Sequence, residues 1–154
     1  MYPTLVALHS WMRWLVLISL LFALYRAYTG WLGKKTYTRF DNSVRNTTVT
    51  FLHIQFLLGL GLYFVSPLVD YFLHHFKEAM HERQARFFGL EHIFVMLLSV
   101  VIITIGSAKA KRKRLDKQKF KTLAIWFTIG LLLILSSIPW PFSPLISRPW
   151  VRLF

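Results

Sequence analysis

The feature that most constrains this chain is an apolar run near its start that carries two ionisable side chains, His9 and Arg13. At ~1.5 Å of rise per residue, a helix over residues 5–24 matches the ~30 Å hydrocarbon core of a bilayer. An ionisable group at membrane depth costs at least ~2.5 kcal/mol, so it faces a bundle interior or a polar ligand and marks a candidate functional site. Because His9 and Arg13 are four residues apart, they share one helix face.

Composition indicates an integral membrane protein. The chain has 154 residues, of which 55% are hydrophobic and 17% aromatic, well above the usage of soluble domains. The net charge of +13 gathers between the apolar segments, where it sets membrane orientation, so nucleic acid is not an expected partner. The absence of cysteine excludes disulfides, thiolate metal sites, iron–sulfur clusters and c-type haem attachment. Any iron ligand must therefore be histidine or methionine.

Four apolar segments predict four membrane-spanning helices. They lie at approximately residues 5–28, 47–66, 87–107 and 120–138. Short connections make consecutive helices antiparallel neighbours, so the expected fold class is all-α, an integral membrane four-helix up-down-up-down bundle. We expect residues 1–154 to form this single domain.

The connections differ in character. Residues 69–86 mix aromatic and charged side chains and predict a short amphipathic, interfacial helix between spans two and three. Lys and Arg crowd residues 30–46 and 107–121, with Gly30 and Gly33 expected to stop the first helix. By the positive-inside rule these two basic connections are cytoplasmic and both termini are periplasmic, in a bacterial inner membrane.

Two histidines are expected at one depth. His9 and His92 each lie five or six residues into an inward-running span, hence within ~10 Å of the outer surface. The first and third helices of an up-down bundle are diagonal, and the wider diagonal gap leaves room for a flat macrocycle between two imidazoles. This arrangement favours a b-type haem with His9 and His92 as axial ligands. Arg13, one turn deeper, is expected to pair with a haem propionate or with Glu91.

Other interpretations of the polar residues remain open. A histidine near a helix end can simply hydrogen-bond a neighbouring helix, and this applies above all to His53, which lies at another depth with Gln55 nearby as a second polar site. Gly59 and Gly61 permit close backbone approach. The set His74, Glu78, His81 and Glu82 has spacings compatible with a surface zinc or copper site, although a solvated helix face gives the same pattern.

Several short motifs carry a family resemblance. They are residues 8–15 (LHSWMRWL), 63–68 (YFVSPL), 91–92 (EH) and 137–142 (SIPWPF). In this order they resemble a group of small bacterial four-span membrane proteins labelled cytochrome b-like, over nearly the whole chain. The resemblance implies a b-haem and membrane electron transfer. More loosely, the histidines resemble half of a haem A synthase or a cytochrome b561 domain, although the usual two ligand pairs are not evident here.

The leading functional hypothesis is a small haem-b-binding membrane protein that exchanges electrons with a quinol or a partner cytochrome. Such a protein is an electron carrier or subunit rather than a free-standing enzyme. The alternative is a cofactor-free accessory or structural subunit of a larger membrane complex, whose apolar helix faces pack on a partner or on further copies of the chain. A small transporter is disfavoured, because no span is visibly broken at mid-membrane and no inverted repeat is evident.

Overall fold

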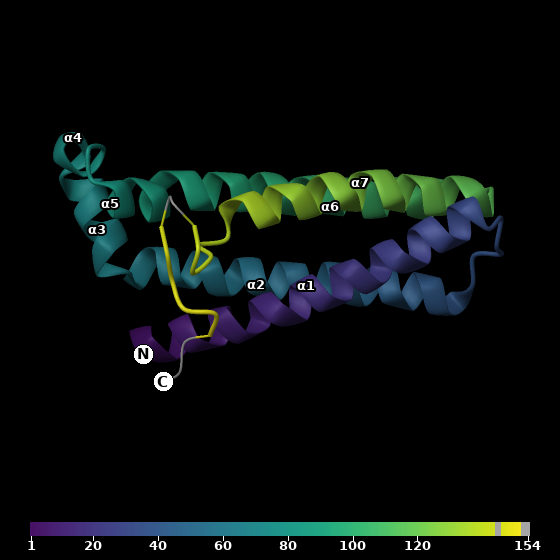
Figure 1. Ribbon diagram of the computed structural model, residues 1–154, viewed down its shortest axis with the longest axis horizontal. Coiled ribbons are helices and arrows are strands. Elements are labelled where there is room, and N and C mark those ends of the chain that lie inside the picture. Colours follow the sequence, from purple (N-terminus) through teal and green to yellow (C-terminus); the bar gives the residue numbers. More distant parts are fainter. Residues whose placement is uncertain (144–145, 152–154) are drawn as a thin grey trace.

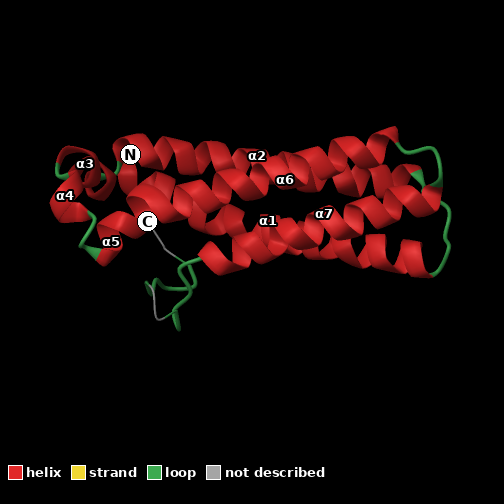
Figure 2. Cartoon of the chain, turned by 90° about the horizontal axis from the view of Figure 1, so that it is seen from above, coloured by secondary structure: helices red, strands yellow, loops and turns green. Residues whose placement is uncertain are grey.

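The computed structural model describes residues 1–143 and 146–151. All regular structure within these ranges is helical. The long helices are α1 (Tyr2–Leu32), α2 (Arg39–Val65), α6 (His92–Arg112) and α7 (Asp116–Ser137). Figure 1 shows the α1–α2 and α6–α7 connections at one end of the bundle, and the short helices and both chain termini at the other. Figure 2 shows the same division from above.

Four helical stretches are long and apolar enough to cross a membrane, as the sequence predicted. They are Tyr2–Leu32, Arg39–Val65, Arg83–Arg112 and Asp116–Ser137. Large apolar side chains cover the outside of the bundle, and Leu21, Phe64 and Leu132 are 55%, 78% and 61% exposed. An outward apolar surface of this kind suits contact with lipid. The chain is therefore a multi-pass helical membrane protein by length and composition.

The first helix does not stop at Gly30, so that part of the prediction was wrong. A Cβ added to Gly30 would lie 2.5 Å from Cζ of Phe120, so this glycine lets α7 approach α1 closely. The helix ends at Leu32, and the Gly33 N–H donates to the Thr29 carbonyl at 3.0 Å.

The basic connections are shorter than expected. Thr38 and Asp41 form a capping box that starts α2 at Arg39: the Thr38 N–H donates to Asp41 Oδ2 at 2.9 Å and the Asp41 N–H donates to Thr38 Oγ1 at 3.3 Å. Two orphan donors of the first turn are thereby satisfied. Between α6 and α7 only residues 113–115 lie outside the helices. Most of the predicted basic loops is therefore helical.

Helix packing places α1 and α6 at opposite corners of the bundle. Each of them packs against both α2 and α7, and α2 and α6 make the loosest of these four neighbouring contacts. The α6–α7 pair is the tightest, because glycine admits a neighbour at two positions. A Cβ on Gly106 would lie 2.2 Å from Cβ of Trp126, and one on Gly130 would lie 2.3 Å from Cγ1 of Ile103.

The segment between α2 and α6 folds as several short helices instead of one amphipathic helix. They are α3 (Pro67–His74), α4 (Phe76–Ala79), α5 (Arg83–Arg86) and the π-helix η1 (Phe87–Glu91). The backbone leaves the helical region at His75 (φ −125°, ψ 48°) and is extended at Glu82. These breaks bring Phe72, Ala79 and Ala85 into a small buried cluster, which a single straight helix could not form.

Candidate functional site

A cavity of about 220 Å³ lies inside the bundle at the end that carries the short helices. All four long helices and the C-terminal segment contribute to its wall, and most lining side chains are apolar. Polar side chains nevertheless reach it from three helices: His9 and Arg13 from α1, Gln55 from α2 and His92 from α6. No carboxylate lies among the lining residues that the structure describes. The cavity is thus an apolar chamber with basic and imidazole groups.

His92 is oriented by the end of α7. Its Nδ1 lies 2.8 Å from the carbonyl oxygen of Ser137, the last residue of that helix. This carbonyl is left without an intrahelical partner, because Pro141 has no N–H. Since a carbonyl only accepts, Nδ1 of His92 must carry the hydrogen, and Nε2 is left with its lone pair. A histidine fixed in this way through Nδ1 is prepared to bind a metal through Nε2.

The π-helix η1 ends directly before His92. Its wider turn changes the direction of the residues that follow relative to a continuous α-helix, and such turns are frequent at functional sites. Tyr63 of α2 donates its hydroxyl to the Gly89 carbonyl within this turn at 3.0 Å.

His9 is held by Gln55 across the α1–α2 interface. Gln55 Nε2 donates to the His9 carbonyl oxygen at 3.1 Å and lies 3.2 Å from His9 Nε2. Because the carbonyl only accepts, the Gln55 atom is the amide nitrogen, and His9 Nε2 must accept its second hydrogen. His9 therefore carries its own hydrogen on Nδ1. That Nδ1 and Gln55 Oε1 are both buried without a partner.

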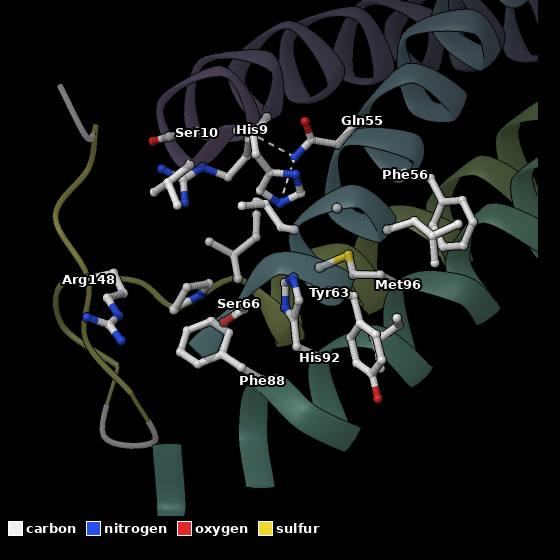
Figure 3. Close-up of a pocket in the computed structure, with 18 of the residues that line it drawn as sticks. His9, Ser10, Gln55, Phe56, Tyr63, Ser66, Phe88, His92, Met96 and Arg148 are labelled. Carbon is white, nitrogen blue, oxygen red and sulfur yellow. Dashed lines mark hydrogen bonds between the residues drawn. The ribbon is translucent and has the colours of Figure 1, made fainter. Parts of the chain in front are cut away.

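The two imidazoles face a common space. Figure 3 shows the ring of His9 extending from α1 and the ring of His92 from α6, with Met96 beside the gap between them and Tyr63 beside His92. In both histidines the hydrogen-bond partners place the hydrogen on Nδ1 and the lone pair on Nε2. The structure thus brings His9 and His92 into one cavity from diagonal helices.

Arg13 lines the same cavity but does not pair with Glu91. Its Nη2 donates to the carbonyl of Trp150, which also accepts from Nε1 of Trp14 at 3.2 Å. Arg13 Nε is buried without a partner. Glu91 points elsewhere and forms an ion pair with Arg86, with Nε and Oε1 2.7 Å apart, so the expected Arg13–Glu91 pair was wrong.

The C-terminal segment forms part of the site, which the sequence did not indicate. Trp140, Phe142 and Trp150 pack on one another and against Trp14 of α1, with ring centroids 5.7–6.5 Å apart. These aromatic residues form a tail of the kind that is enriched at membrane interfaces. In the structure this tail folds back onto the cavity wall, because the indole of Trp14 and the guanidinium of Arg13 both donate to its backbone.

The remaining sequence candidates lie outside the cavity. His53 is exposed on α2, and its Nε2 lies 2.9 Å from Thr104 Oγ1 of α6. His74 bonds to the Asp70 carbonyl through Nδ1 at 2.9 Å. Among the residues that the structure describes, no three His, Cys, Asp or Glu side chains gather as a metal site.

A second polar cluster, at the opposite end of the bundle, was missed in the sequence. Arg45 is 4% exposed and donates from Nη1 to the carbonyl oxygen of Ser107 at 2.9 Å and to its hydroxyl at 3.1 Å. Asp41, 3% exposed, pairs with Arg26 at 2.8 Å. Burial beside this cluster raises the pKa of the Tyr37 phenol, an effect that Arg45 partly opposes. The Thr38–Asp41 capping pattern could have revealed this cluster in the sequence, because it indicates that a helix begins at residue 39, where a loop was expected.

Fold and site together define a multi-pass helical membrane protein with two imidazoles facing an internal cavity. No family model, curated protein or solved structure matches the chain.

Proposed function

We propose that this protein binds a b-type haem within the membrane, with His9 and His92 as the axial ligands. The observation that carries the proposal is the pair of imidazoles on diagonal helices, each in the Nδ1–H tautomer: the lone pair is on Nε2 in both, and in His9 that lone pair accepts from Gln55. Bis-imidazole ligation of haem requires two neutral histidines that face each other across the macrocycle.

The donor set fits such a group. The cavity is mainly apolar and has two histidines and no carboxylate among its described lining. Arg13 Nε is buried there without a hydrogen-bond partner, which costs about 1–3 kcal/mol unless a bound anion accepts from it. Arg13 is the residue to hold an anionic propionate, because a guanidinium and a carboxylate form charge-assisted hydrogen bonds.

The cavity must widen to admit a macrocycle. The volume of 220 Å³ is below the roughly 300–1,000 Å³ of typical cofactor pockets. The α2–α6 side is the loosest interface between neighbouring long helices, and its lining residues Phe56 and Ile93 are only half-buried. We therefore propose that α2 and α6 separate slightly when the group binds.

A bound b-haem supplies reversible one-electron chemistry, and the chain supplies its ligands, its burial and the charge beside it. We propose electron exchange with a quinol or a partner cytochrome as the role. The resemblance to cytochrome b-like four-span proteins is in keeping with this role.

The membrane arrangement is part of the proposal. We propose an up-down-up-down bundle in a bacterial inner membrane, with residues 69–86 at the outer interface and both termini periplasmic. Support comes from the eight Lys and Arg residues of the stretch 109–121, which lie at the bundle end opposite the cavity. By the positive-inside rule, that end of the bundle faces the cytoplasm. The haem site is then near the outer surface.

Reconstitution tests the binding directly. Ligand-free protein in detergent is titrated with ferric protoporphyrin IX and followed by absorption. We expect saturation at one equivalent per chain, and no such saturation in a His9→Ala, His92→Ala double variant. Equal binding by the double variant would contradict the proposal.

A further inference from the structure

The two histidines of the cavity differ in one respect. His92 is fixed through Nδ1, by a carbonyl outside the cavity wall, so its Nε2 stays available. His9 is fixed through Nε2 itself, the atom that would bind iron, by the amide of Gln55 at 3.2 Å. One lone pair cannot serve both a hydrogen bond and a metal ion.

We infer that Gln55 is a positioning residue that holds Nε2 of His9 in the ligand-free protein and must release it before His9 can bind iron. The inference rests on the proposed function and adds an order to it: His92 binds first, and His9 second. After it releases Nε2, Gln55 stays close to His9, because the same amide nitrogen also donates to the His9 carbonyl oxygen at 3.1 Å. That second bond leaves the backbone of α1 in place while the imidazole changes partner.

Gln55 also sets the tautomer that coordination needs. By donating to Nε2, it keeps the hydrogen of His9 on Nδ1, so no proton has to move between ring nitrogens when the metal arrives. The residue therefore has two opposing effects. Gln55 selects the Nδ1–H tautomer of His9, which leaves the lone pair on Nε2. It also competes with iron for that lone pair.

Two substitutions change the hydrogen bond at His9 Nε2 in opposite ways. Leucine has a similar size and no donor, so Gln55→Leu removes the competition and should tighten binding of ferric protoporphyrin IX by roughly 2- to 10-fold, the value of one ordinary hydrogen bond. An ionised glutamate only accepts, so Gln55→Glu, assayed at a pH at which the carboxyl group is ionised, draws the hydrogen of His9 onto Nε2 and should weaken binding at least 10-fold. A purely structural role for Gln55 would weaken binding in both variants. Gln118→Leu, on an exposed position near the start of α7, is the matched control and should not change binding.

The experiment combines absorption titrations with ¹⁵N NMR of histidine-labelled, ligand-free protein, His9 being assigned by its loss in His9→Ala. We expect the Nδ1–H tautomer for His9 in the wild type and the Nε2–H tautomer in Gln55→Glu. An unchanged tautomer in Gln55→Glu, or Gln55→Leu affinity at or below wild type, overturns the inference. If wild-type protein binds no haem, the proposed function fails and the release step fails with it. Equal haem affinity in the wild type and Gln55→Leu contradicts the inference alone.

Discussion

Gly59 of α2 lies against the imidazole of His9: a Cβ added to this glycine would be 3.0 Å from His9 Cε1 and 3.5 Å from His9 Nδ1. The contact is tighter than ordinary van der Waals packing, so the ring keeps its place only because residue 59 has no side chain. We expect Gly59→Ala to displace the ring by a few tenths of an ångström and to lower haem affinity several-fold, measured by absorption titration.

The chain supplies a matched control two residues away. A Cβ on Gly61 would meet no atom within 4 Å. Gly61→Ala should therefore leave haem affinity unchanged. Both substitutions raise helix propensity by about 1 kcal/mol, so this gain cancels in the comparison. Equal affinities for the two variants would show that the position of His9 does not matter for binding.

Removal of the Arg13 guanidinium should loosen the haem without changing its ligands. Arg13→Ala leaves both imidazoles in place and removes one of the two arginines, Arg13 and Arg148, that line the cavity. Loss of a charge-assisted hydrogen bond should speed haem transfer to apomyoglobin roughly 10-fold, with the visible bands preserved. Arg83→Ala, on the exposed face of α5, should transfer haem at the wild-type rate. Loss of the bands in Arg13→Ala would indicate a structural role instead.

The polar cluster at the other end of the bundle should contribute to stability and not to binding. The Asp41 side chain is 2% exposed and pairs with Arg26, which is 30% exposed. Asp41→Ala leaves that arginine without its partner and removes the carboxylate half of the α2 capping box, so the free energy of unfolding should fall by about 3 kcal/mol. Asp70→Ala breaks only an exposed pair with His74 and should cost less than about 1 kcal/mol. Denaturation in detergent measures both, and haem affinity should stay unchanged in each.

The orientation in the membrane can be tested with reporter fusions. We expect alkaline phosphatase to be inactive when fused after Lys113 and active when fused at the end of the chain, because the proposed topology places the basic connection between α6 and α7 in the cytoplasm. Active phosphatase after Lys113 would reverse the topology and place the cavity near the inner surface.

The four long helices could be predicted because bilayer thickness sets the length of an apolar membrane-spanning run, and that length can be read directly from the sequence. Helix ends were harder to predict. Gly30 looks like a stop signal, yet it continues α1, because its missing side chain is used for contact with Phe120. The role of a glycine depends on what lies opposite it, which the sequence alone does not show.

The same limit applies to the site. Periodicity and depth suggested that His9 and His92 could meet, and the structure places both on one cavity. The partners of the polar groups were not predictable. The carbonyl of Trp150, which accepts from Arg13, is 137 residues away in the chain. Every residue has a backbone carbonyl, so the residue type does not show which one will accept a hydrogen bond. Glu91 was one of two partners expected for Arg13, because a buried guanidinium requires an anionic or hydrogen-bonding partner, whereas in the structure Glu91 pairs with Arg86, five residues before it.

The absorption spectrum of the purified protein, oxidised and reduced, tests the central claim most directly. We predict the split visible bands of a low-spin bis-imidazole haem in the reduced form. They should be abolished by His9→Ala and by His92→Ala and retained in His53→Ala, whose imidazole lies outside the cavity next to Thr104. A folded, fully helical protein that purifies colourless from haem-replete cells, or a spectrum lost on His53→Ala, would contradict the account. The colourless result would instead favour a cofactor-free accessory subunit, in which His9, Gln55 and His92 form an interhelical polar cluster.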